Sequence, residues 1–246
     1  MTTAPRWLTL FLDIPAANHE AGCAFWQAAT GHAMSSPRGT HGEFATLVPP
    51  AGDAHLRIQS IRTGEFRVHV DLHVDDLDAA VEHALAVGAH LVARPDHAIL
   101  RSPAGFVFCL VTGHGGTTRA TPANWGDHRS LPDQLTVDVA HDAWEREKTF
   151  WSELTGWTVA PSARPEFARL RTPPTLPVRV LLQRLDDGAT TGHLDIATDH
   201  RAAEVARLTR LGARELSGGP SWTVMTGPDH SIFCVTDRDP ATGLLP

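Results

Sequence analysis

His69 and Asp71 stand two residues apart in the stretch from Val68 to Asp76, and the same pair recurs as His193 and Asp195. Residues two apart on a β-strand point to the same face, so each pair places an imidazole beside a carboxylate. The carboxylate can raise the pKa of its neighbour and orient it for acid–base chemistry. Both groups can also be ligands of a divalent metal, or the carboxylate can accept structural hydrogen bonds alone. The pair by itself leaves these three interpretations open.

The stretch that carries the first pair alternates apolar Val68, Val70, Leu72 and Val74 with polar residues. A period of two predicts a strand with one apolar and one polar face. A first helix is expected to open at Asn18 and to end at Gly31, where the C-cap needs a positive φ. Asp75 or Asp76 can cap a second helix, which ends at Gly88. A third helix ends at Gly156, and its start, Asp142 to Glu145, resembles a capping box. A fourth ends at Gly212.

The chain is an internal duplication. His69 and His193 are 124 residues apart, and the aromatic pair Phe25-Trp26 returns 125 residues later as Phe150-Trp151. A finer repeat lies inside each copy, because an aspartate on a strand is followed 17 or 18 residues later by a helix-ending glycine in all four units. We therefore predict two modules, 1–112 and 134–246, joined by a Gly- and Pro-rich linker at 113–133 in which Trp125 packs down.

The composition excludes several classes of function. A formal net charge of −7 without a basic stripe argues against a nucleic acid partner. No apolar run reaches the roughly 20 residues that span a bilayer, so we expect no membrane association and a cytoplasmic location. The three cysteines cannot all pair, and none lies in a CxxC motif, which favours reduced, buried thiols.

Four strand-helix-strand-strand-strand units, with FWQAATG and FWSELTG after the first strand of each pair, resemble the vicinal oxygen chelate superfamily. The glyoxalase-like group, which includes bleomycin resistance and dioxygenase proteins, is the most similar. The resemblance implies an α+β fold of two tandem modules, each closing a curved mixed sheet into a cup. It also implies metal ligands on the first, fifth and last strands of a module, where metal-dependent members carry His or Gln, His, and Glu.

This chain departs from that ligand pattern. Phe11 and Thr136 occupy the first-strand positions and Cys109 and Cys234 the last-strand positions, so only the histidines of the fifth strands are kept. We therefore expect no metal site of the family's type and no cofactor, although a divalent metal stays possible. A rearranged site would use Asp13, His69 and Asp71, with Asp138, His193 and Asp195 as its counterpart. The two cysteines are interpreted first as core residues, and less favourably as metal ligands or nucleophiles.

The candidate site residues follow from these patterns. The catalytic candidates are His69, Asp71, His193 and Asp195; the ligand-binding candidates are Asp13, Gln59, His97, Asp138, Gln183 and Trp222. Trp222 is expected to stack on a flat ligand, and its counterpart His97 gives the other module a different wall. Histidines without ligand spacing are expected to be solvated: His41, His55, His83, His90, His114, His128 and His200.

The favoured function is recognition of a small organic molecule in one or both cups, with transformation that needs no metal. One alternative is a divalent-metal-dependent lyase, isomerase or dioxygenase. Another is a protein that sequesters an antibiotic or toxin without catalysis, as family members do. An exposed sheet edge leaves a homodimer open.

Overall fold

The computed structural model describes residues 4–113, 115–160, 162 and 164–246, so His114 lies outside the described residues. Its first-half elements are β1 (Trp7–Pro15), the 3-10 turn η1 (Ala16–Asn18), α1 (His19–Thr30), β2 (Ala33–Met34), β3 (Phe44–Val48), β4 (Leu56–Ile61), β5 (Arg67–His73), α2 (Leu77–Ala86), β6 (His90–Ala93), β7 (Ala98–Arg101), β8 (Val107–Val111) and β9 (Ala123–Asn124). None of the described helices is long and apolar enough to cross a membrane.

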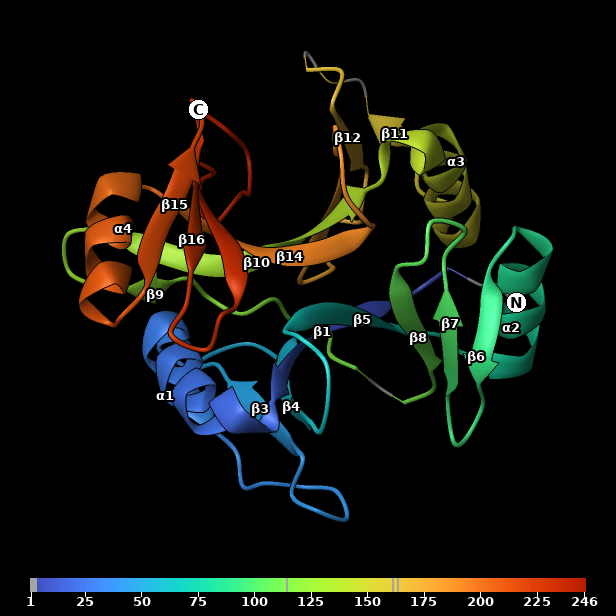
Figure 1. Ribbon diagram of the computed structural model, residues 1–246, viewed down its shortest axis with the longest axis horizontal. Coiled ribbons are helices and arrows are strands. Elements are labelled where there is room, and N and C mark those ends of the chain that lie inside the picture. The colour runs from blue at the N-terminus through green and yellow to red at the C-terminus, as the bar shows by residue number, and fades with distance from the viewer. Residues whose placement is uncertain (1–3, 114, 161, 163) are drawn as a thin grey trace. The chain divides into compact units, whose positions relative to one another are not determined.

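The second-half elements repeat this order (Figure 1). They are β10 (Arg129–Val139), the 3-10 turn η2 (His141–Ala143), α3 (Trp144–Thr155), β11 (Val159–Ala160), β12 (Phe167–Leu170), β13 (Arg179–Arg184), β14 (Thr191–Thr198), α4 (Arg201–Arg210), β15 (Arg214–Gly218), β16 (Trp222–Thr226) and β17 (Ile232–Thr236). The predicted α+β class and the four repeated units are confirmed.

Each copy contributes its strands to one mixed sheet. The strand orders are β2-β3-β4-β1-β5-β8-β7-β6 and β11-β12-β13-β10-β14-β17-β16-β15, with β9 paired to β10 outside the second path. Within these sheets β5 pairs with β8 in parallel, and β14 pairs with β17 in parallel. The parallel pair matters for function because it sets the two His-x-Asp strands beside the strands that carry Cys109 and Cys234.

The helices begin and end for local reasons. Gly31 and Gly156 terminate α1 and α3 with φ of 70° and 72°, a left-handed conformation that only glycine adopts cheaply. Asp76 caps α2 by accepting the backbone N–H of Ala79 at 3.0 Å. The capping box predicted at Asp142 is wrong: η2 occupies these residues, and α3 starts at Trp144 without a side-chain cap.

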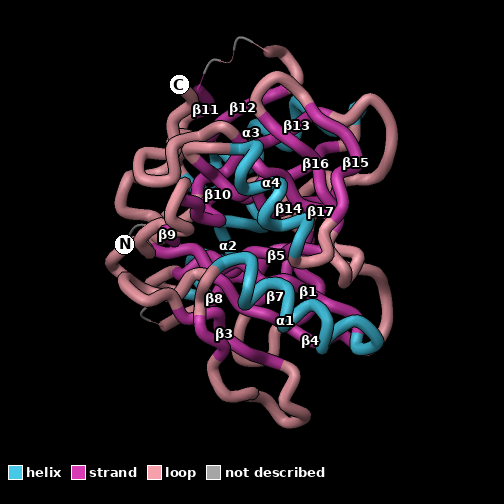
Figure 2. The backbone as a smooth tube through the Cα atoms, turned by 90° about the vertical axis from the view of Figure 1, so that its left-hand side faces the viewer, coloured by secondary structure: helices cyan, strands magenta, loops and turns pink. Residues whose placement is uncertain are grey.

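The chain forms two compact units that cut across the duplication, so far as it is described. One consists of Met1–Leu10, His69–Thr118 and Leu135–Gly192; the other consists of Phe11–Val68, Arg119–Gln134 and His193–Pro246. In the first unit, α2 packs on β8; in the second, α4 packs on β15 and β17, and Figure 2 shows α4 lying against its strands. Residues 119–134 are built into the second unit, and the predicted module boundaries stay a prediction.

Both units bury a helix of one sequence copy against a strand of the other. In the second unit, Phe25 and Trp26 of α1 pack around Phe233, with ring centroids 5.7 and 5.3 Å away. In the first, Phe150 and Trp151 of α3 pack around Phe108 in the same way. All six rings are at most 3% exposed, which identifies the recurring aromatic pair as core.

Each of these aromatic cores also buries one carboxylate. Trp26 donates its indole N–H to Asp229 at 3.0 Å, and Trp151 donates to Glu147 at 2.9 Å. Asp229 lies in the turn before β17, whereas Glu147 lies on the helix itself. The helix position equivalent to Glu147 is Gly22, where an added Cβ would lie 2.9 Å from the Asp229 carboxylate. Each core thus has one buried carboxylate that accepts an indole N–H. In one core the turn before the strand supplies it, and in the other the helix does.

Candidate functional site

The tighter of two equivalent clusters is built on β14 and β17. Alternation along β14 buries Leu194 and Ile196 completely on one face and places His193 and Asp195 on the other. In the parallel register Asp195 stands opposite Cys234. The imidazole, carboxylate and thiol therefore gather on a single face of the sheet because of strand pairing alone.

The contacts in this cluster meet at one atom. Nε2 of His193 lies 3.2 Å from Oδ1 of Asp195 and 3.5 Å from Sγ of Cys234. Gln134, on β10, donates its side-chain amide to the other Asp195 oxygen, Oδ2, at 2.5 Å. The four residues are at most 8% exposed. Gln134 thus fixes the orientation of the carboxylate and leaves Oδ1 directed toward the imidazole.

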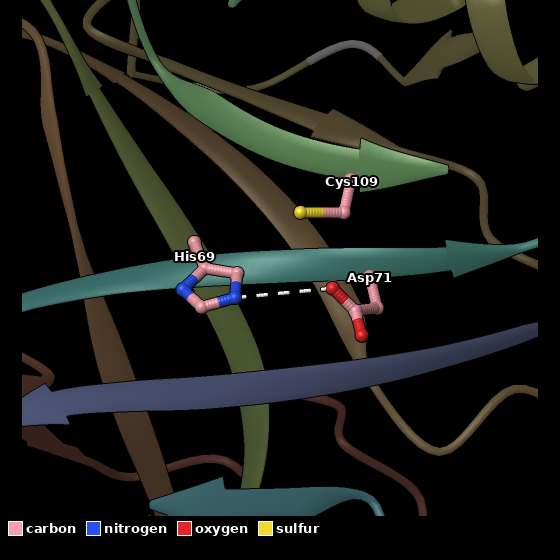
Figure 3. Close-up of side chains that lie close together, drawn as sticks. All are labelled: His69, Asp71 and Cys109. Carbon is pink, nitrogen blue, oxygen red and sulfur yellow. Dashed lines mark ion pairs between the residues drawn. The ribbon is translucent and has the colours of Figure 1, made fainter. Parts of the chain in front are cut away.

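The equivalent cluster contains His69 and Asp71 on β5 and Cys109 on β8 (Figure 3). Asp71 and Cys109 are again opposite one another in the parallel register. The separation between His69 Nε2 and Asp71 Oδ1 is 3.8 Å, longer than in the other cluster. At the position of Gln134 this copy has Thr9, whose hydroxyl contacts His73 Nε2 at 2.9 Å.

The geometry argues against a nucleophilic triad. In a triad the two imidazole nitrogens have separate partners, because one takes the nucleophile's proton while the other donates to the carboxylate. In the second-copy cluster the carboxylate and the thiol approach the same nitrogen, Nε2 of His193. One ring nitrogen cannot serve both partners of such a relay.

The same convergence fits a metal ion. In each cluster the three candidate ligand atoms lie within 4.8 Å of one another. Donors held about 2.0–2.3 Å from a tetrahedral ion are separated from each other by about 3.3–3.8 Å. The 3.2 and 3.5 Å separations around His193 are close to these values. Three protein donors leave a fourth position for water or substrate, which is the arrangement of a catalytic rather than a structural site.

Asp13 and Asp138, the other carboxylates of the predicted rearranged site, belong to neither three-donor cluster of the described residues. Asp13 is fully buried and pairs with Arg67 Nε at 2.7 Å. Asp138 accepts a long hydrogen bond of 3.5 Å from the Thr191 hydroxyl. The metal-capable sets use a cysteine where these aspartates were expected from the sequence, and a ligand-binding role for Asp13 and Asp138 stays a prediction.

The remaining ligand-binding candidates are half-buried. Trp222 and Cys234 share one face of the sheet, because Trp222 pairs with Thr236 while Val224 pairs with Cys234 in the antiparallel register. By the same alternation His97, one residue before β7, is on the face of Cys109, since Ile99 pairs with Cys109. Gln59 and Gln183 stand opposite Phe44 and Phe167 in the outer strand pairs. The roles of these four side chains stay predictions.

Gln134 was missed by the sequence analysis. It precedes Thr136 by two residues, so it shares the polar face of β10 with the position compared with the family's first ligand. The sequence did offer a signal for Gln134: a polar amide two residues from Thr136, and therefore on the same face of the predicted strand.

The expectation that histidines without ligand spacing are solvated is wrong for His55 and His128, which are 1% and 5% exposed. His55 donates from Nε2 to the Pro132 carbonyl at 2.9 Å, and burial lowers its pKa. His128 lies between Asp127 and Glu204, with each contact at 2.7 Å. The Pro132 carbonyl is 77 residues from His55, and Glu204 is 76 residues from His128. The spacing of residues in the sequence does not reveal partners at such distances.

A family model described as "Glyoxalase-like domain" matches residues 9–111 and 134–236. A search among curated proteins found no match. Similar solved structures include the Mn(II)-bound glyoxalase from Novosphingobium aromaticivorans, at 16% identity and a TM-score of 0.65, covering 99% of this chain and 86% of that one. The 2,2',3-trihydroxybiphenyl 1,2-dioxygenase from Sphingomonas wittichii strain RW1 is 16% identical with a TM-score of 0.63, covering 95% and 90%.

Homoprotocatechuate 2,3-dioxygenase from Arthrobacter globiformis is 11% identical, with a TM-score of 0.65, and covers 96% of this chain and 81% of that one. At these identities the likeness establishes the fold alone.

Proposed function

The chain belongs to the glyoxalase-like domain family, and from that premise we propose that it is an enzyme that uses a divalent metal ion at the His193, Asp195 and Cys234 cluster to transform a small organic molecule. One observation carries the proposal: a carboxylate oxygen and a thiol sulfur both approach Nε2 of His193 at distances typical of neighbouring metal ligands. The proposal favours the metal-dependent alternative of the sequence analysis over the metal-free one.

The chain's own residues would have distinct tasks at this site. His193 offers the lone pair of neutral Nε2, Asp195 offers Oδ1, and Cys234 offers its sulfur after releasing its proton. Gln134 acts as a positioning residue, because its hydrogen bond to Oδ2 holds the carboxylate in place. A bound divalent ion would supply Lewis-acid polarisation of a substrate oxygen. Trp222, on the same sheet face, offers a flat surface on which a planar part of the substrate can stack.

The contacts support a second candidate in which no metal takes part. A proton on His193 Nε2 can be shared with Asp195 Oδ1 at 3.2 Å, so the pair could hold an imidazolium and act in acid–base chemistry or in ligand binding alone. In that case the thiol of Cys234 is a packing neighbour. Metal content separates the two candidates.

The experiment is elemental analysis of protein purified without chelator, followed by titration of the metal-free chain with Zn²⁺, Mn²⁺ and Fe²⁺. We expect stoichiometric binding that is lost in His193→Ala. His200→Ala is the matched control, since His200 is an exposed histidine at the start of α4 and caps nothing with its side chain. Wild-type protein that binds none of the three ions would contradict the metal-dependent proposal and favour the metal-free candidate.

A further inference from the structure

Resting on the proposed function, we infer that the ion at the second-copy cluster is held through the Cys234 thiolate, and that the site is therefore a zinc-type, redox-neutral centre that does not activate O₂. Two of the structurally similar proteins named above are dioxygenases, so the ligand that holds the ion decides whether this chain is expected to share that chemistry. The donor atoms of this chain point to a different class, such as isomerisation, addition or hydrolysis.

The donor set is the first support. The non-haem Fe(II) sites that activate O₂ commonly present two imidazoles and one carboxylate, with open positions and without a sulfur ligand. This cluster presents one imidazole, one carboxylate and one thiol. Thiolate is a soft ligand that favours Zn²⁺ over Mn²⁺ or Mg²⁺, whose preferred donors are oxygens. Replacing the second imidazole by sulfur therefore shifts the metal preference toward zinc.

The fixed position of the sulfur is the second support. Cys234 lies in the middle of β17, between Phe233 and Val235, both of which are fully buried. Its register partner on β14 is Asp195, so sheet hydrogen bonds hold the thiol beside the carboxylate. The register fixes the Cys234 backbone beside Asp195, and its sulfur lies within 4.8 Å of the imidazole and carboxylate donor atoms. An ion held by His193 and Asp195 therefore has the sulfur within reach as its third protein donor.

Chemical compatibility is the third support. Cysteine thiolate is oxidised to sulfenic and then to irreversible sulfinic and sulfonic acids. A centre that activates O₂ brings an oxidant next to its sulfur ligand, so a thiolate is kept at such a centre only where the site protects the sulfur, as in haem enzymes with a cysteine ligand. A zinc-type ion has no accessible second oxidation state, so it can polarise a substrate without that risk.

The test uses Co²⁺ as a spectroscopic substitute for zinc in the whole, metal-free chain. We expect one equivalent of Co²⁺ bound at this cluster to produce a near-ultraviolet sulfur-to-cobalt charge-transfer band, and Zn²⁺ to displace it. The band should vanish in Cys234→Ser and persist in Cys23→Ser. Cys23 is a half-buried cysteine on α1 outside both clusters, which makes it the matched control.

Metal titrations give an independent readout. We expect Cys234→Ser to weaken Zn²⁺ binding by at least about tenfold while Mn²⁺ binding changes by less than about twofold, because only the softer ion gains from sulfur. Circular dichroism checks that Cys234→Ser is folded. If the variant does not fold, the cobalt band of the wild-type chain still tests for a sulfur ligand.

The outcomes separate the proposed function from the inference about sulfur. A chain that binds no divalent ion overturns both. Co²⁺ binding without a sulfur band, equal losses of Zn²⁺ and Mn²⁺ affinity in Cys234→Ser, or O₂ uptake with catechol by the metal-loaded protein would overturn the inference alone. A sulfur band with a selective loss of zinc supports it.

Discussion

The two copies of the duplicated module share one order of helices and strands but differ in side chains at equivalent positions. Around His193, Gln134 bonds the carboxylate and the imidazole lies 3.2 Å from it; around His69, Thr9 bonds His73 instead and the separation is 3.8 Å. The buried carboxylates of the aromatic cores differ as well: Trp26 donates to Asp229, which lies in a turn, and Trp151 donates to Glu147, which lies on a helix. Duplication thus kept the architecture and let one cluster become tighter than the other, which favours the second copy as the functional one.

The largest expected effect comes from removing the central imidazole of the second-copy cluster, and the matched change in the first copy gives the comparison. His193→Ala should abolish measurable metal binding and activity, because a directly bound ligand is worth more than the roughly 10–100-fold of a neighbouring positioning group. His69→Ala should reduce either quantity by less than about fivefold. Equilibrium dialysis and turnover assays of both variants measure the contrast. Equal losses in the two variants would refute a functional difference between the copies.

An acid-sensitive histidine is expected in the first copy, at a position where the second copy has a tryptophan. His32 follows the C-cap glycine of α1, and Trp157 takes its place after α3. Burial, together with the nearby His55, lowers the His32 pKa to about 4. The unfolded chain therefore binds more protons between pH 6.5 and about 4, so up to about 3 kcal/mol of stability is lost as pH falls through that range.

Denaturant unfolding of wild type and His32→Asn between pH 7 and pH 4 measures this loss. The variant should show a flatter pH profile, since it has no imidazole at position 32 to protonate. Parallel profiles would show that His32 does not titrate in this way.

The buried carboxylates of the aromatic cores give the next prediction. Trp26→Phe removes a hydrogen bond from the fully buried Asp229 carboxylate and should lower the free energy of unfolding by about 2 kcal/mol. Trp151→Phe should cost a similar amount, since Glu147 likewise loses one donor and keeps the Ala104 backbone N–H. Chemical denaturation of the two variants compares them directly. A difference above about 2 kcal/mol would mean that the two contacts are not equivalent.

The smallest effect concerns the positioning residue. Gln134→Ala should weaken metal binding by about tenfold, because the Asp195 carboxylate loses the donor that orients it. Thr9→Ala, the matched change in the other copy, should leave the affinity of this cluster unchanged. Zinc titration of both variants is the measurement. An unchanged affinity in Gln134→Ala would mean that this hydrogen bond does not account for the difference between the two clusters.

Periodicity and repetition were enough to predict the architecture. Alternation identified the strand around His69, and the glycines at 31 and 156 marked helix ends correctly. The repeat also placed both His-x-Asp pairs on strands. These features depend on contacts close in sequence or on the duplication itself, so they can be read without a structure.

Which residues form the cluster could not be predicted from the sequence, because this depends on the pairing of strands that are distant in sequence. Cys234 reaches His193 because β14 and β17 are parallel neighbours in one particular register, and a shift of one residue would turn the sulfur to the other face. Neither strand's register can be read from its own residues, so aspartates were expected where the structure has sulfur. The buried partner of His128 was missed for the same reason, since Glu204 is 76 residues away.

The partner that Trp26 meets has a consequence for how the protein is made. Asp229 follows Trp26 by 203 residues, and Arg207, which donates to the last carbonyls of α1 at Ala28 and Ala29, follows almost as late. While the ribosome is still translating the second copy, α1 has neither the carboxylate that accepts the Trp26 indole N–H nor the arginine that binds its last two carbonyls. This helix therefore completes these contacts only when the residues up to Asp229 have emerged.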